Sequence, residues 1–287
     1  MTRSLISLFA LVMLTMVAFA ANSLLARLAL ADSAIDAGSY TFLRLVSGAI
    51  VLIFLATRLS ARKIKKVLSE GNWVSALALF TYAAGFSFAY LALDTGMGAL
   101  ILFAMVQATM IGWALANGDR PIPLEWIGLV IAFGSFIWLV SPGLAAPDPF
   151  GTLLMVVSGA AWGIYSVRGR SAANPLAATA GNFVLSVPAA TLLLVFTLSN
   201  ASANPLGIVL AIISGAITSG LGYALWYRVL PQISSTQGAI VQLTVPVIAA
   251  AAGVAFIGEE LTFKFGAASL LILGGVALAI TAKARRS

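Results

Sequence analysis

The residues best suited to chemistry in this chain are side-chain amides that interrupt long apolar stretches. Asn22, Gln107 and Gln242 each lie within such a stretch. An amide offers two donors and an acceptor oxygen, so it can hold an amino or carboxyl group without carrying a net charge. The alternative is a hydrogen bond between two helices, which is worth roughly 1 kcal/mol in a membrane. These amides therefore indicate either binding of a polar solute or helix packing.

Aromatic residues accompany the amides. Tyr82, Phe86 and Tyr90 recur every four residues and so form a stripe on one helix face. Three further aromatic residues lie deep within apolar stretches: Trp162, Tyr165 and Tyr223. A tyrosine hydroxyl that faced lipid would lack a hydrogen-bond partner, so we expect these tyrosines to face the bundle interior. The set suits a neutral or zwitterionic solute with a large apolar group, although packing between helices is the competing interpretation.

Charged and nucleophilic groups are scarce where chemistry would need them. The chain has no histidine and no cysteine, which removes the commonest general base and the thiolate metal ligands. No Asp or Glu lies near the centre of an apolar stretch; Asp94 and Glu259 fall at the ends, where solvated helix caps are expected. We therefore predict no catalysis, metal or cofactor. Arg44 is the one strong charge within a stretch, and it either extends to the interface or faces the interior and meets a carboxylate or helix-end carbonyls.

Composition shows what must position these residues. The chain is 61% hydrophobic and 9% charged, whereas soluble domains carry about 25% charged residues. Stretches of about 20 apolar residues match the hydrocarbon core of a bilayer. The predicted spans are 4–29, 38–58, 72–93, 97–117, 123–141, 150–168, 176–199, 206–228, 236–257 and 263–282. Aromatic residues near span ends are expected at the membrane interface: Trp73, Trp113, Trp126, Trp138, Trp226 and Tyr227.

The two halves of the chain resemble each other. Residues 95–101 read like 235–241, and residues 85–93 read like 222–230. We therefore predict two repeats, at 1–145 and 146–287, with the Pro- and Gly-rich segment 141–149 at their junction. Each half holds an odd number of spans, so the second repeat must be inverted in the bilayer. Inverted repeats are typical of alternating-access transporters, which bind substrate near the midplane at the repeat interface.

The basic charge predicts orientation rather than nucleic-acid binding. All but three of the 16 basic residues fall on one side if the N-terminus is cytoplasmic; the exceptions are Arg27, Arg44 and Lys264. By the positive-inside rule, both termini are then cytoplasmic. The first span resembles a secretory signal, but its apolar run is too long, and cleavage would break the symmetry of the repeats.

Two residues are candidates for conformational change. Pro246 lies inside a span, where proline removes a backbone hydrogen bond and kinks the helix. Gly163 ends the small-residue motif that begins at Gly159, and such motifs allow helices to pack closely. Each is interpreted either as a packing feature or as a gating hinge.

The ten spans, the paired repeats and the segment 238–247 with Gly258 and Glu259 downstream resemble the drug/metabolite transporter superfamily, in particular its EamA-type members. Asn22, Arg44 and the aromatic stripe look like the YddG-type exporters of aromatic amino acids. The resemblance implies an all-α integral membrane protein and export of amino acids through a central cavity. It would place seven candidate residues on the spans that line the cavity: Asn22, Tyr82, Gln107, Trp162, Tyr165, Tyr223 and Gln242.

We therefore expect a multi-pass transporter of the cell inner membrane, not an enzyme, that exports aromatic and other neutral or zwitterionic amino acids by alternating access. Without a central carboxylate for proton exchange, facilitated diffusion is the expected mechanism. The alternative is an exporter of another small solute, such as a nucleoside, sugar or xenobiotic, with proton coupling still open. The expected partners are the solute and the lipid bilayer, with no nucleic acid and no obligatory protein partner.

Overall fold

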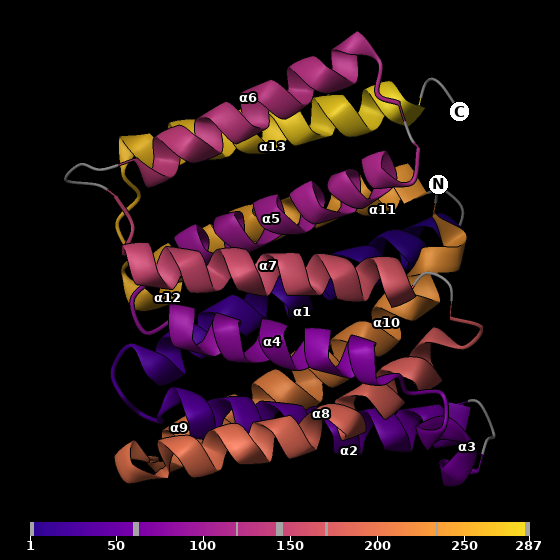
Figure 1. The fold of residues 1–287 in the computed structure, drawn as a ribbon, viewed down its shortest axis with the longest axis vertical. Helices are drawn as coiled ribbons and strands as arrows, with labels where there is room; N and C mark the ends of the chain where they lie inside the picture. Colours follow the sequence, from indigo (N-terminus) through magenta and orange to yellow (C-terminus); the bar gives the residue numbers. More distant parts are fainter. Residues whose placement is uncertain are drawn as a thin grey trace.

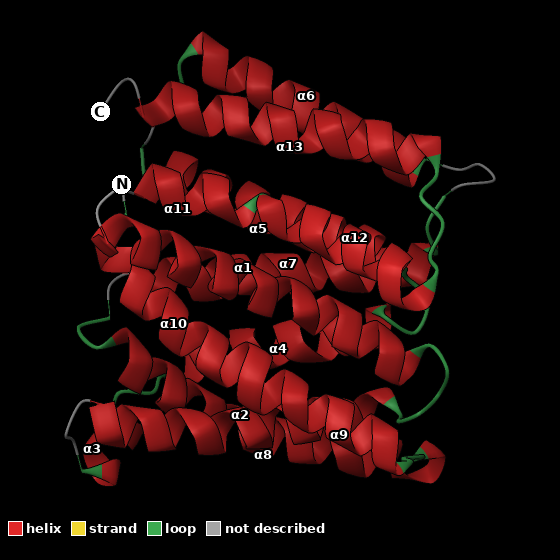
Figure 2. Cartoon of the chain, turned by 180° about the vertical axis from the view of Figure 1, so that it is seen from behind, coloured by secondary structure: helices red, strands yellow, loops and turns green. Residues whose placement is uncertain are grey.

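The computed structural model describes residues 3–59, 63–118, 120–141, 146–169, 172–233 and 235–284. These residues form helices joined by short connections (Figure 2). The elements are α1 (Arg3–Leu30), α2 (Ala37–Leu59), α3 (Ile64–Leu68), α4 (Trp73–Ala89), α5 (Thr95–Ala116), α6 (Pro123–Val140), α7 (Pro149–Gly169), α8 (Pro175–Thr197), η1 (Leu198–Asn200), α9 (Pro205–Ile213), η2 (Ser214–Leu221), α10 (Gly222–Val229), η3 (Leu230–Gln232), α11 (Ser235–Gln242), α12 (Thr244–Ile257) and α13 (Phe263–Ala284). Arg62, Arg170, Arg285, Arg286 and the junction residues 142–145 lie outside the described residues.

The predicted all-α membrane fold is confirmed. Within the described residues, nine stretches are long and apolar enough to cross a membrane, and α4 is a shorter apolar helix that corresponds to the third predicted span. The sequence did not predict α3, a five-residue basic helix. It also did not predict that span eight contains a π-helix, η2, between α9 and α10.

Local residues explain where the helices begin and end. Asn72, Asn174 and Asn204 precede α4, α8 and α9, and each side-chain oxygen accepts a hydrogen bond from a backbone N–H of the first turn. Gly258 ends α12 in the left-handed conformation, at φ 74°, which glycine adopts without steric cost. These caps satisfy backbone groups that the helices themselves cannot pair.

The helices lie side by side, and their connections alternate between the two ends of the bundle (Figure 1). Both termini and α3 lie at one end, called here the termini end; the α1–α2, α4–α5 and α12–α13 connections lie at the opposite end (Figure 1). The main pairings between the two halves are α6 with α13, α4 with α7, α2 with α8 and η2, and α5 with α7 and α12, while α1 packs against α9, η2, α10 and α12.

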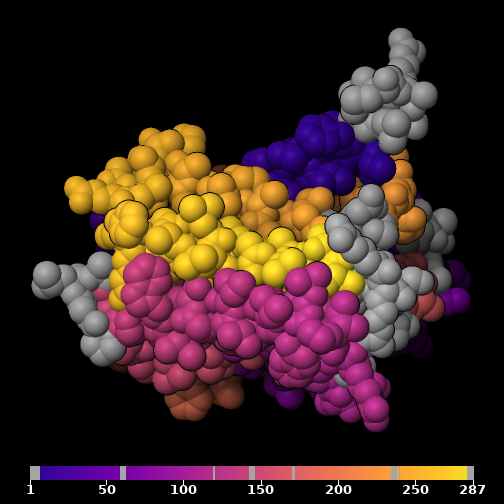
Figure 3. All heavy atoms as spheres, turned by 90° about the horizontal axis from the view of Figure 1, so that it is seen from above, coloured from indigo at the N-terminus to yellow at the C-terminus, as the bar shows by residue number. Residues whose placement is uncertain are grey.

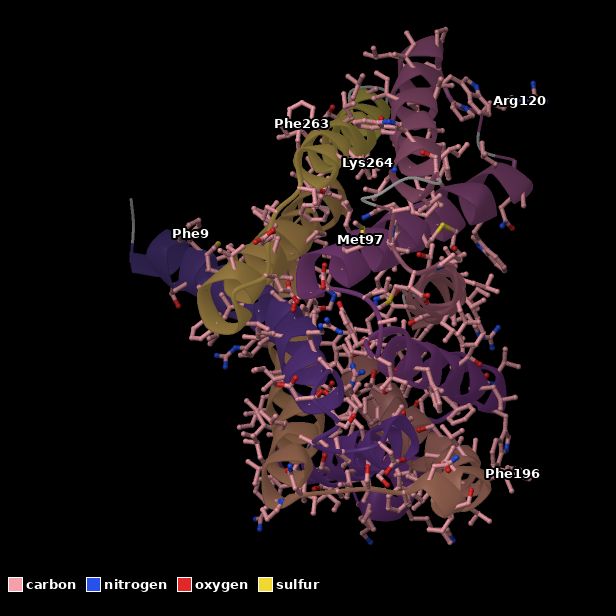
Figure 4. The ribbon with its side chains drawn as sticks, turned by 90° about the vertical axis from the view of Figure 1, so that its left-hand side faces the viewer. Phe9, Met97, Arg120, Phe196, Phe263 and Lys264 are labelled. Carbon is pink, nitrogen blue, oxygen red and sulfur yellow. The ribbon has the colours of Figure 1, made fainter. Side chains whose placement is uncertain are left out.

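The α6–α13 pair forms one edge of the bundle, which Figure 3 shows from outside. Gly128 and Gly275 allow the two helices to approach closely, because a β-carbon on either would lie 2.5 Å from the other's carbonyl oxygen. Large apolar side chains cover the perimeter, and Figure 4 shows Phe9, Phe196 and Phe263 pointing away from the bundle. An apolar perimeter of this kind is what lipid requires.

Candidate substrate cavity

A cavity of about 380 Å³ opens in the half of the bundle nearer the termini end. Its wall includes Gly169, Pro175 and Leu230, which lie where α7 ends, α8 begins and α10 ends. The rest of the wall is largely aromatic: Phe19, Trp162, Tyr165, Tyr223, Trp226 and Tyr227, with Gln242 and Gly238 from α11. We call this cavity the vestibule. Its volume falls within the range of small-molecule sites, roughly 300–1,000 Å³.

Stacked rings close the deep side of the vestibule. The ring of Trp162 stacks on Tyr165 and on Tyr223, with centroids 5.2 Å apart in each pair. The ring of Phe19 is tilted against that of Tyr223, with centroids 5.8 Å apart, and the ring of Trp162 also contacts that of Tyr82 at 4.8 Å. We call Phe19, Trp162 and Tyr223 the aromatic layer, because these three residues separate the vestibule from a smaller pocket beyond it.

The inner pocket holds about 20 Å³, which is room for about one water molecule. Asn22, Ser23, Tyr82 and Phe86 line it together with the aromatic layer. The oxygen Oδ1 of Asn22 accepts hydrogen bonds from the hydroxyls of Ser214 at 2.9 Å, Thr218 at 2.6 Å and Ser219 at 3.3 Å, all on η2. These bonds fix the orientation of the amide beside the pocket.

Arg44 lies behind the inner pocket and is 2% exposed, so it does not extend to the interface. Its Nη2 donates to the Tyr82 hydroxyl at 2.8 Å, and its Nε donates to Ser219 Oγ at 3.5 Å. The guanidinium carbon also lies 4.6 Å from the ring centroid of Phe86 and 5.2 Å from that of Tyr82. A cation over an aromatic face is attracted by the ring quadrupole. Of the two predicted positions for Arg44, the structure shows the interior one.

Six of the predicted site residues line these two cavities: Asn22, Tyr82, Trp162, Tyr165, Tyr223 and Gln242. Gln242 lines the vestibule, and its Nε2 donates to the Gly238 carbonyl of the same helix at 3.2 Å. Gln107 is buried at 4% exposure but lines neither cavity; it borders a separate apolar crevice between α5, α6 and α13. The amide pattern alone could not show which face of its helix Gln107 occupies.

Sequence reasoning missed several residues of the vestibule. The sequence predicts Trp226 and Tyr227 at the membrane interface, but both line the vestibule, because α10 turns that face inward. The hydroxyl of Tyr227 pairs with Thr179 Oγ1 at 2.9 Å, and Tyr165 donates to the same Thr179 oxygen at 3.2 Å. Thr179 gave no sequence signal, since a single threonine near a helix start is usually a packing or capping residue.

Four residues link the helices at the opposite end, and we call them the opposite-end cluster: Arg27, Asp94, Thr95 and Glu259. Glu259 accepts hydrogen bonds from the backbone N–H and the hydroxyl of Thr95, both at 2.8 Å. Arg27 forms ion pairs with Glu259 at 3.7 Å and with Asp94 at 3.4 Å. The Glu259 side chain is 9% exposed, whereas that of Asp94 is 58% exposed. The expectation of a solvated cap is therefore wrong for Glu259.

Known proteins resemble this chain along its length. The sequence profile of the EamA-like transporter family matches residues 149–281. An uncharacterized protein of Pseudomonas aeruginosa is 46% identical over 277 residues, or 96% of each chain. An uncharacterized transporter of Archaeoglobus fulgidus is 24% identical over 80% of this chain and 82% of its own. The threonine/homoserine exporter RhtA of Escherichia coli K12 is 28% identical over 57% of this chain and 55% of its own.

A solved crystal structure, 19% identical in sequence, aligns over 100% of both chains with a TM-score of 0.68, which establishes likeness of fold. The structure has an apolar perimeter and inward-facing polar and aromatic side chains, as a membrane transporter requires. Two of these relatives are themselves described as a transporter and an exporter. Residues 149–281 therefore form an EamA-like transporter domain, and the chain belongs to the drug/metabolite transporter superfamily.

Proposed function

We propose that this transporter exports neutral and zwitterionic amino acids, aromatic ones among them, from the cytoplasm. The observation that carries the proposal is the vestibule, whose aromatic walls and amide suit an apolar side chain beside a polar headgroup. A distant relative that exports threonine and homoserine supports the substrate class. The residues proposed to contact substrate are Asn22, Tyr82, Trp162, Tyr165, Tyr223 and Gln242.

Loading from the cytoplasm requires the termini end to be cytoplasmic. Described basic residues at that end support this orientation: Arg58, Lys63, Lys65, Lys66, Arg120, Arg168 and Arg228. The chain has no cysteine, so a maleimide would label only a cysteine introduced by substitution. In intact cells, an impermeant maleimide should label Ser202→Cys at the opposite end and leave Ser69→Cys near α3 unlabelled. Labelling of Ser69→Cys alone would reverse the orientation.

Alternating access fits this arrangement, because the vestibule opens towards one end and the ion pairs of the opposite-end cluster join helices at the other. Two repeats, at 1–145 and 146–287, account for the pairing of helices. The counterparts α2 and α8, α5 and α12, and α6 and α13 pack against each other, as an axis between two inverted halves requires.

The hinge is proposed to lie where α11 meets α12. Leu243 separates these helices, and Pro246 has no N–H to donate to the carbonyl of Gln242, one turn earlier. Gly163 is proposed as a sliding contact, since a β-carbon there would lie 2.6 Å from Thr109 of α5.

Facilitated diffusion is the proposed mechanism. The buried carboxylates of the described residues, Glu125 and Glu259, lie in the first turn of α6 and just beyond the end of α12. Neither lies beside the vestibule, where a proton-exchanging carboxylate would be needed.

Flux into liposomes tests the function. Purified protein should give saturable uptake of labelled phenylalanine, leucine and threonine above protein-free liposomes, with initial rates that an imposed pH gradient changes less than about twofold. Uptake of uridine or glucose without uptake of any amino acid would support the alternative cargo. Accumulation driven by the pH gradient would instead establish proton coupling.

A further inference from the structure

Among the described residues, Arg44 is a buried charge without a counterion. Its Nη1 has no hydrogen-bond partner, and no carboxylate of the described residues lies within ion-pair distance of it. The hydroxyl of Tyr40, four residues earlier on α2, is also buried, and Ser214 of η2 lies beside it. Hydroxyls and rings supply all the contacts that the guanidinium makes. Arg44 Nη1 therefore has hydrogen-bonding capacity that the described part of the protein leaves unused.

An unpaired guanidinium is costly to bury, because the contacts with neutral groups do not replace its hydration. A carboxylate is the group that compensates it best. Carboxylate oxygens accept two parallel N–H bonds from the planar fork of arginine, and these charge-assisted bonds are stronger than neutral ones. An amine or other cation at the same place would be repelled. The unpaired Nη1 thus favours a ligand that carries a carboxylate.

The transport pathway reaches this charge through two shared side chains. Tyr82 and Phe86 contact the guanidinium and also line the inner pocket. Ser219 bonds to Arg44 on one side and to Asn22, another pocket residue, on the other. The inner pocket is too small for a solute while the aromatic layer is closed, whereas the vestibule is large enough for an amino acid.

We propose that Arg44 binds the carboxylate of the transported solute when the aromatic layer opens, with the Tyr82 hydroxyl turning to share the contact. The proposal rests on amino-acid export as the function, and it assigns the orientation of the bound solute. The carboxylate enters first, towards Arg44, and the side chain stays in the aromatic vestibule. A carboxylate then becomes a requirement for binding, and cationic solutes are excluded.

Binding of an acid and its amide tests this assignment. Titration calorimetry on the detergent-purified full chain compares L-phenylalanine with L-phenylalaninamide, which keeps the ring and amine but lacks the carboxylate. The wild type should prefer the acid at least about tenfold, which corresponds to about 1.4 kcal/mol. Arg44→Gln should reduce the preference to within about twofold, and Arg44→Lys should retain part of it. Arg27→Gln, the same change at the opposite-end cluster, is the matched control and should leave the preference unchanged.

The outcomes separate the two proposals. An equal affinity of the wild type for acid and amide overturns the role of Arg44 without any variant, so the test survives a variant that does not fold. An unchanged preference in Arg44→Gln, with amino-acid flux intact in the wild type, overturns the role of Arg44 and leaves export standing. If the wild type binds and carries no amino acid, the proposed export fails and this inference fails with it.

Discussion

Arg27 and Arg44 are both arginines on apolar helices, and the protein treats them differently. Arg27 lies at the opposite end with Glu259 and Asp94 beside it, and its Nη1 also donates to the carbonyls of Tyr90 and Leu91. Arg44 is more deeply buried and has hydroxyls and rings but no carboxylate among the described residues. A charge neutralised by the protein can hold two helices together, whereas a charge without a counterion is available to a ligand.

The difference between the two arginines is removed most directly by placing a carboxylate beside Arg44. Ser219→Asp puts an anion beside Nε, so the carboxylate of a solute must compete with a permanent internal partner. We expect amino-acid flux in liposomes to fall at least about 100-fold, or about 2.7 kcal/mol. Ser219→Asn adds the same volume without charge and should lose less than about tenfold. Equal losses in the two variants would attribute the effect to volume rather than charge.

The next effect concerns the aromatic layer that separates Arg44 from the vestibule. Trp162→Ala removes the ring that stacks on Tyr165 and Tyr223. Loss of such an aromatic contact typically costs about 2 kcal/mol, so we expect flux to fall about 30-fold with the protein still folded in the membrane. Trp113→Ala, at a half-exposed tryptophan on α5, should keep flux within about twofold. Normal flux in Trp162→Ala and in Gln242→Ala would remove both residues from the site.

A third change removes the ion pair between Arg27 and Glu259. Glu259→Gln leaves Arg27 without its buried carboxylate and should open the opposite end. Ser23→Cys, 2% exposed and one turn from Arg27 on α1, reports this opening. We expect labelling of Ser23→Cys by an impermeant maleimide to rise about tenfold when Glu259→Gln is added, because loss of about 1.4 kcal/mol shifts a two-state equilibrium by that factor. Unchanged labelling would show that the cluster does not hold this end closed.

The smallest effect is expected at Asp94. Its side chain is 58% exposed, and exposed ion pairs contribute about 0–1 kcal/mol. Asp94→Asn should therefore change both Ser23→Cys labelling and flux by less than about twofold. A change as large as that of Glu259→Gln would mean that both carboxylates of the cluster, rather than the buried one, close the opposite end.

The sequence predicted the spans well, because a bilayer demands long apolar helices and their ends are marked by caps and prolines. It did not predict α3 or η2. The five-residue helix α3 is too short and basic for a hydropathy signal, and η2 is a change of backbone hydrogen bonding that its small residues do not announce.

The candidate site was predictable only in part. Tyr82 and Tyr223 could be placed inside, since a buried hydroxyl needs a partner, and both line the inner pocket. Gln107 shows the limit of this reasoning. A polar residue on a buried helix can face the central cavities or, as Gln107 does, a separate crevice between α5, α6 and α13. The environment of Glu259 depends on Arg27 and Thr95, which are far from it in sequence, so no local pattern could reveal it.

The π-helical stretch η2 has a consequence for the rotational phase of the eighth span. A π-helix closes i→i+5 hydrogen bonds, so it holds more residues per turn than the α-helices on either side of it. Compared with an uninterrupted α-helix, η2 therefore rotates α10 about the helix axis relative to α9. This rotation changes which face α10 presents to the vestibule when α9 packs against α2. Deleting one residue within η2 would turn Tyr223, Trp226 and Tyr227 by about a quarter of a revolution relative to α9. The composition of the vestibule wall thus depends on the length of a backbone segment as well as on its side chains.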